Sequence, residues 1–186
     1  MATATQIEWT DATWNPVTGC TKITAGCDNC YAARFSARFR GVPGHPFENG
    51  FDLTLRPDRV AQPLLWRRRR MIFVNSMSDL FQKGVPQNFI DSVFSTMETA
   101  DWHVFQLLTK RSSLMRDYLK PRYRDNPPPA HIWVGVSLEN AKARSRQELT
   151  YFERLRKKRW SYKSKSVATK SKPNEAAHRR KCSVLR

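Results

Sequence analysis

Three cysteines fall within eleven residues, in the segment GCTKITAGCDNC at residues 19–30. Their spacing is Cys20-x6-Cys27-x2-Cys30. Thiolates are ligands for zinc and iron, and they are also nucleophiles and redox groups. Three thiols cannot all pair as disulfides, and a four-ligand metal site would lack one ligand. The segment therefore predicts a site that another group must complete.

The cysteines alone are compatible with four interpretations. A structural zinc site could use the three thiolates with His45 as the fourth ligand. Cys27 and Cys30 could instead form a redox pair at a helix N-terminus, which lowers a thiol pKa. The cysteines could also be small buried core residues. The fourth interpretation is a [4Fe–4S] cluster held by three thiolates, with one iron left open for a substrate or cofactor.

The elements that would position these thiols follow from hydrophobic periodicity. Residues 28–40 have helical spacing, with Tyr31, Phe35 and Phe39 four residues apart, and a strand and a helix are expected at 51–55 and 57–66. Three strand-then-helix repeats come next. The expected strands are residues 71–76, 102–109 and 131–137, and the expected helices are 85–100, 112–119 and a segment from 139 onward. Nearly continuous apolar strands that alternate with helices indicate an α/β fold with a parallel sheet.

Polar residues follow each predicted strand. Ligands bind at the carboxyl ends of parallel strands, so these residues are expected to line one rim. Ser76, Asp79, Lys110 and Glu139 are the candidate cofactor-binding residues there. The neighbouring Arg111 could hold a carboxylate or phosphate, or simply form a loop ion pair.

Other notable side chains are interpreted as structural. His103 and His131 stand at strand starts, away from the predicted rim. The aromatic residues Trp9, Trp14, Tyr31, Phe35 and Phe39 are expected to pack in the core. The run RRRR at residues 67–70 is expected to be a solvated charged face, with phosphate contact as the alternative.

A cysteine loop that runs into a helix ahead of a βα series resembles radical S-adenosylmethionine enzymes, although their usual motif is C-x3-C-x2-C. Four blocks resemble an uncharacterised phage and prophage family with a three-cysteine motif, described as radical-S-adenosylmethionine-like. The blocks are IEWTDATWNPVTGCTKITAGCDNCYA, FVNSMSDLF, FQLLTKR and IWVGVSLEN. The resemblance implies Cys20, Cys27 and Cys30 as ligands of a [4Fe–4S] cluster that binds S-adenosylmethionine. The substrate is unknown, and a partner protein is conceivable.

The resemblance also implies a (β/α) barrel, which usually needs about 200 residues or more. We expect residues 1–155 to form a partial, incomplete TIM-like barrel and residues 156–186 to be a basic, disordered tail. The abrupt change in composition suggests a truncated or frameshifted chain, which could lack activity.

The formal charge of +17 is concentrated near the C-terminus. Residues 154–186 hold 13 Lys and Arg and one acidic residue, which suggests weak nucleic-acid contact through the tail. The start of the chain lacks a secretory signal, and no apolar run approaches the ~18 residues of a membrane span. A cytoplasmic protein of a bacterial host or prophage is expected. The functional alternative is a zinc-stabilised, basic nucleic-acid-binding protein without catalysis.

Overall fold

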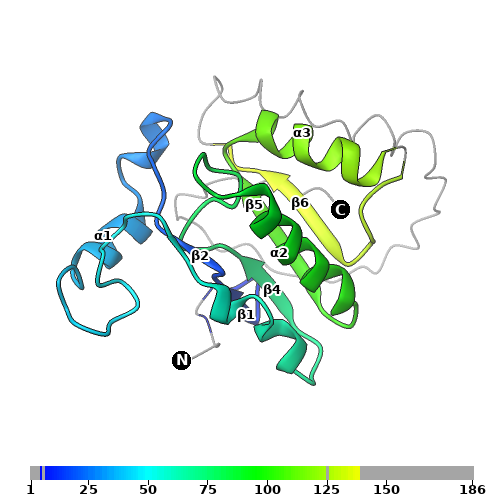
Figure 1. Cartoon of the computed structure of the whole chain (residues 1–186), viewed down its shortest axis with the longest axis horizontal. Helices are drawn as coiled ribbons and strands as arrows, with labels where there is room; N and C mark the ends of the chain where they lie inside the picture. Colours follow the sequence, from blue (N-terminus) through cyan, green and yellow to red (C-terminus); the bar gives the residue numbers. More distant parts are fainter. Residues whose placement is uncertain (1–4, 6, 125, 139–186) are drawn as a thin grey trace, which may run out of the picture.

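The computed structural model of the chain describes residues 5, 7–124 and 126–138, and Figure 1 shows how their elements are arranged. Four strands form one parallel sheet in the order β1-β4-β5-β6. The strands are β1 (Ala12–Trp14), β4 (Met71–Val74), β5 (Val104–Thr109) and β6 (Ile132–Val136). The predicted α/β class with a parallel sheet is therefore confirmed.

The strand register places one row of buried apolar side chains on a single face of the sheet. Ile72 of β4 pairs with Ala12 of β1 and with Phe105 of β5, and Phe105 pairs with Ile132 of β6. Helices α2 (Gln87–Thr99) and α3 (Ser112–Tyr123) lie over the sheet and contribute to the same core. Their buried residues recur with helical spacing, for example Ile90, Val93, Phe94 and Met97 in α2.

A smaller unit lies beside the sheet (Figure 1). It contains an antiparallel pair, β2 (Val17–Thr18) and β3 (Thr54–Leu55), a 3-10 turn η1 (Ala25–Cys27) and helix α1 (Tyr31–Ala37). Of the aromatic residues expected in the core, Trp14 is fully buried. That expectation is wrong for Trp9, Tyr31 and Phe35, which are exposed. Phe35 instead packs with Phe39 and Phe47 in a small aromatic cluster outside the main core.

The helix expected at 57–66 is absent as one α-helix. Two short 3-10 helices replace it, η2 (Pro57–Arg59) and η3 (Gln62–Leu65). Pro63 supplies the physical reason, because proline has no backbone N–H and its ring clashes with the preceding turn of an α-helix. The other predicted βα boundaries agree with the structure to within a few residues.

Some predictions fall on residues outside the described ranges. These are the helix from residue 139 and the tail at 156–186. Among the described residues, no helix combines the length and the apolar character needed to cross a bilayer.

Candidate functional site

The cysteine loop, residues 19–30, is attached to the carboxyl edge of the parallel sheet. The backbone N–H of Gly19 donates to the Met77 carbonyl at 3.1 Å. The side chain of Gln82 bonds the loop twice, since its Nε2 donates to the Gly19 carbonyl at 2.8 Å and its Oε1 accepts from the Thr21 N–H at 3.2 Å. Asn15 strengthens this edge by accepting the Met77 N–H at 2.9 Å. These contacts fix the start of the loop beside the segment that follows β4.

Gly19 is required by the close approach of two backbones. Its φ of +83° lies in a region that side chains disfavour. A Cβ added there would lie 2.2 Å from the Asp52 carbonyl oxygen. The backbone at this position can therefore pass beside Asp52, which precedes β3, only with glycine.

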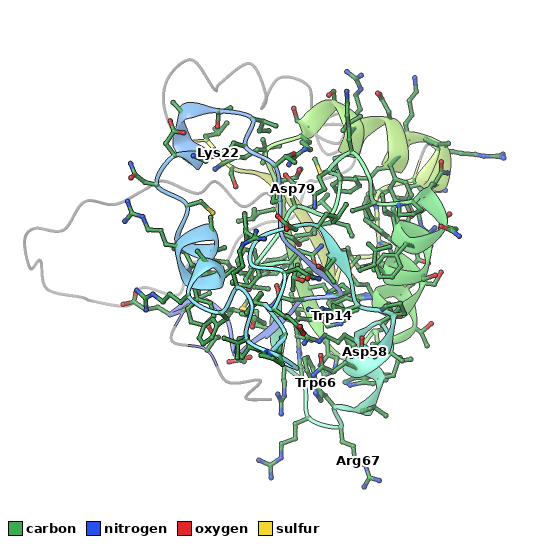
Figure 2. The ribbon with its side chains drawn as sticks, turned by 60° about the vertical axis from the view of Figure 1, so that its left-hand side comes forward. Trp14, Lys22, Asp58, Trp66, Arg67 and Asp79 are labelled. Atoms are coloured by element: carbon green, nitrogen blue, oxygen red, sulfur yellow. The ribbon has the colours of Figure 1, made fainter. Side chains whose placement is uncertain are left out.

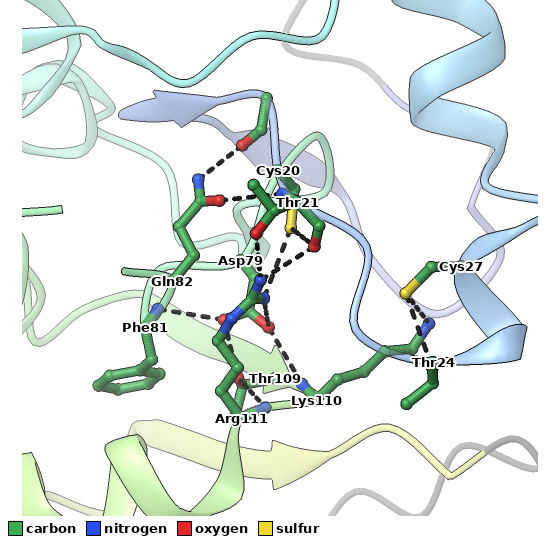
Figure 3. A network of polar contacts seen from close by, with 11 residues as sticks. Cys20, Thr21, Thr24, Cys27, Asp79, Phe81, Gln82, Thr109, Lys110 and Arg111 are labelled. Carbon is green, nitrogen blue, oxygen red and sulfur yellow. Dashed lines mark hydrogen bonds and ion pairs between the residues drawn. The ribbon is translucent and has the colours of Figure 1, made fainter. Parts of the chain in front are cut away.

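Arg111 connects the end of β5 to the first cysteine (Figure 3). Its Nη1 lies 3.5 Å from the Cys20 Sγ, and its Nη2 donates to the Thr21 carbonyl at 2.9 Å and to the Thr21 hydroxyl at 3.0 Å. Burial raises the pKa of the Cys20 thiol, while the Arg111 guanidinium opposes that rise. Arg111 thus presents a positive charge directly to this sulfur.

Asp79 holds the Arg111 guanidinium in place. The two side chains form an ion pair at 3.0 Å and are only 9% and 7% exposed, respectively. The carboxylate also accepts from the Phe81 N–H at 3.1 Å, the Thr109 hydroxyl at 2.7 Å and the Lys110 N–H at 3.1 Å. Although burial acts against the cation, the negative charge of Asp79 raises the pKa of Arg111. All these bonds satisfy Asp79 as a buried anion.

Cys27 lies near a second cation. The Lys110 Nζ is 3.9 Å from the Cys27 Sγ, and the Thr24 hydroxyl is 3.7 Å from it. Burial opposes ionisation here, but hydrogen bonds from the Ile23 and Thr24 backbone and the charge of Lys110 lower the pKa of the Cys27 thiol. Cys27 is therefore easier to deprotonate than an ordinary cysteine.

Cys30 lies at the N-cap of α1, immediately before the helix. The next residue, Tyr31, donates its hydroxyl proton to the Ser76 carbonyl, which ties the start of α1 to the segment after β4. The helix expected over residues 28–40 begins at Tyr31, so Cys30 precedes its first turn. All three thiols are free and half-buried.

Within the described ranges, no three His, Cys, Asp or Glu side chains gather closely enough to hold a metal ion. His45 stacks on Phe39 with ring centroids 3.9 Å apart, and its Nδ1 accepts from the Phe47 N–H at 3.1 Å. Thiolates are ligands for zinc and for iron, and three free thiols lie on this one loop. A bound cluster would require residues 19–30 to close around it.

Three of the four predicted rim residues lie at the carboxyl edge of the sheet. Asp79 and Lys110 lie at the carboxyl edge and contact the cysteine network, Asp79 through Arg111 and Lys110 directly. Ser76 lies on the same edge, where its hydroxyl donates to the Asn15 Oδ1 at 3.2 Å. Glu139 is outside the described residues.

Sequence reasoning missed Gln82, Thr21 and Asn15 as supports of the loop. Nothing in the local pattern around Gln82 indicates its role, because its bonding partners lie more than sixty residues away. His103 and His131 hydrogen-bond to backbone groups at the opposite edge of the sheet, as expected of structural residues.

Residues 4–162 match the model of a family described as "Protein of unknown function (DUF5131)". The chain belongs to this family. No curated protein and no solved structure matches the chain. The part of the chain that matches DUF5131 contains the whole cysteine loop and every described strand.

Proposed function

We propose that this DUF5131 protein binds a [4Fe–4S] cluster through Cys20, Cys27 and Cys30 and is a radical S-adenosylmethionine-type enzyme. One observation carries the proposal. Three free thiols lie on a single loop attached to the carboxyl edge of a parallel sheet, and cationic side chains contact two of them. Ligand sites of parallel α/β proteins lie at this edge.

The number of thiols favours a cluster over a closed zinc site. A structural zinc site uses four protein ligands, whereas the cysteine loop supplies three thiols. A cluster held by three thiolates keeps one iron open for a cofactor such as S-adenosylmethionine, whose reductive cleavage is the chemistry that such a cluster supplies. The thiols must stay reduced, which suits a bacterial cytoplasm.

The neighbouring cations suit the same proposal. Three thiolates bring negative charge into a half-buried site, and Arg111 and Lys110 offset it next to Cys20 and Cys27. Hydrogen bonds and charges close to the sulfurs also tune the reduction potential of a cluster. Arg111 orients Cys20, whereas Asp79 acts only through Arg111, because its oxygens already accept hydrogen bonds from four groups.

The order of the strands is consistent with an arc of a TIM-like barrel. The sheet order β1-β4-β5-β6 follows the chain without reversal. Doubly wound sheets reverse their order at a switch point, whereas barrels progress in one direction. We therefore propose that the described sheet is part of such a barrel, with Ser76, Lys110 and Glu139 as contacts for the cofactor on its rim.

Anaerobic reconstitution with iron and sulfide tests the proposal. We expect a brown protein with about four irons and a broad absorption band. Cys20→Ala, Cys27→Ala and Cys30→Ala should each lose most of the iron. Cys182→Ala is the matched control, since it removes a thiol far along the sequence from the loop, and it should keep the iron. S-adenosylmethionine should then bind to the reconstituted protein and not to Cys20→Ala.

Two results would overturn the proposal. Iron retained equally by all four variants would show that the loop is not the ligand set. A colourless protein with about one zinc would favour a zinc-stabilised protein without this chemistry. In that case Cys20→Ala should unfold the loop, because structural zinc contributes directly to folding.

A further inference from the structure

A run of four arginines, residues 67–70, lies between η3 and β4. Arg67, Arg68 and Arg69 are exposed, and the first of them projects from the end of the molecule opposite Lys22 and Asp79 (Figure 2). Their side chains form no ion pair or hydrogen bond with any described residue. The run is therefore separate from the cysteine loop and has three uncompensated guanidinium groups.

These arginines account for almost all the net charge of the part of the chain that precedes the basic tail. Residues 1–153 hold 20 Lys and Arg against 15 Asp and Glu. Without the run, the same residues hold 16 basic and 15 acidic side chains. The run therefore carries four of the five net positive charges of this part of the chain.

Trp66 and Arg70, the two residues that flank the exposed arginines, are held by contacts with neighbouring elements. The Arg70 N–H donates to the Nδ1 of the buried His103 at 3.1 Å, and the Arg70 guanidinium lies over the Trp66 ring at 4.9 Å. The Trp102 Nε1 donates to the Trp66 carbonyl at 2.8 Å. Trp66 and Arg70 therefore fix both ends of the exposed segment, which reduces the entropy lost when a ligand binds there.

Apolar groups flank the charges. Trp102 is 38% exposed, so part of its indole can contact a ligand while its N–H stays bonded. Leu65, directly before Trp66, is 77% exposed. Guanidinium groups bind phosphate oxygens in a two-pronged geometry, and exposed indole rings stack on unpaired bases.

We infer that residues 65–70, together with Trp102, form a binding surface for single-stranded nucleic acid. Arg67, Arg68 and Arg69 contact backbone phosphates, and Trp102 stacks on a base. The surface fits a membrane less well, because η3 is only four residues long and is not an extended amphipathic helix. The inference does not depend on a metal cluster, and it differs from contact through the basic tail.

Binding of the full chain to a labelled single-stranded DNA of about 12 nucleotides tests the surface by fluorescence anisotropy. Arg68→Ser/Arg69→Ser removes two proposed phosphate contacts. Arg38→Ser/Lys83→Ser is the matched control, since it removes the same charge at two exposed positions elsewhere. The tail is identical in both variants, so it cannot cause a difference in DNA binding between them. Weaker binding of Arg68→Ser/Arg69→Ser is then due to the arginine run.

Each lost phosphate contact lowers the slope of log K against log salt by about 0.7 for a single strand. We expect the slope of Arg68→Ser/Arg69→Ser to be about 1.4 smaller than that of the wild type, and the control slope to change much less. Trp102→Ala should weaken binding roughly five-fold or more, whereas Trp102→Phe, which also loses the indole N–H, should retain most of it.

Equal slopes for the two double variants would overturn the inference, and so would stronger dependence on the control positions. Vesicles with anionic lipids are the second probe. Binding to vesicles that requires Arg68 and Arg69, without the same requirement for DNA, would overturn the nucleic-acid assignment in favour of a lipid surface. Circular dichroism melts establish that every variant is folded before binding is compared.

Discussion

Asp79 and Arg111 form a buried ion pair on which several contacts of the cysteine loop depend. Removing one charge of such a pair leaves the other buried without compensation, at a cost of about 3–5 kcal/mol. We therefore expect Asp79→Ala to lower the free energy of unfolding by about that amount in urea denaturation. Because the loss comes from the orphaned guanidinium, Asp79→Leu/Arg111→Met should be more stable than Asp79→Ala. A double variant that is less stable than the single one would contradict this explanation.

Gly19 offers a test of the close backbone approach at the loop. Gly19→Ala should destabilise the protein by about 1–3 kcal/mol more than Gly41→Ala. Gly41 is a matched control, since its φ of +79° is similar but no atom lies within 4 Å of an added Cβ. Both changes incur the conformational cost of positive φ, about 1–2 kcal/mol, so the difference measures the clash with Asp52. Thermal melts of the two variants measure it, and equal melting temperatures would count against the clash.

At the scale of elements, α3 stabilises the sheet through one face. Leu119 is fully buried, whereas Leu114 on the same helix is 38% exposed. Leu119→Ala should lower the free energy of unfolding by about 2–5 kcal/mol, because it leaves a cavity. Leu114→Ala should change it by no more than about 0.5 kcal/mol. Chemical denaturation distinguishes them, and similar losses would mean that the packing face of α3 differs from the one described.

The elements also show where sequence patterns succeed. Strands β4, β5 and β6 and helices α2 and α3 follow from long apolar periodicity, which local sequence encodes directly. Strand β1 was not predicted, because its three residues, Ala12–Trp14, are too few to show a periodic pattern. It exists because β4 offers a parallel edge to pair with. The exposure of Phe35 was missed because helical spacing identifies a face without identifying what covers it.

At the scale of the whole molecule, His103 makes unfolding sensitive to pH. Its Nδ1 accepts from the Arg70 N–H, so its Nε2–H donates to the Pro63 carbonyl at 3.1 Å, and the ring must be neutral. Burial and the nearby Arg70 charge lower the pKa of His103 below its ordinary value of 6.5. The unfolded chain therefore binds more protons in this range, and stability rises with pH.

We expect the stabilisation from neutral His103 to be fully present above about pH 6.5 and to be lost as the pH falls toward the lower pKa of the folded state. Urea denaturation between about pH 5 and pH 8 measures this dependence. His103→Phe should remove most of it. An unchanged pH profile in His103→Phe would assign the dependence to other groups.

The sequence by itself determined the three thiols, their spacing and the α/β class with its parallel sheet. These properties depend on residue type and on local periodicity, and both can be read directly from the sequence. Only the tertiary structure decided that Arg111 reaches Cys20 across 91 residues, with Asp79 fixing the guanidinium. That contact exists because the carboxyl ends of β4 and β5 meet at one edge of the sheet, and neighbours along the chain do not encode how distant strands align. The same holds for the four arginines, whose separation from the cysteine loop follows from the two opposite ends of β4.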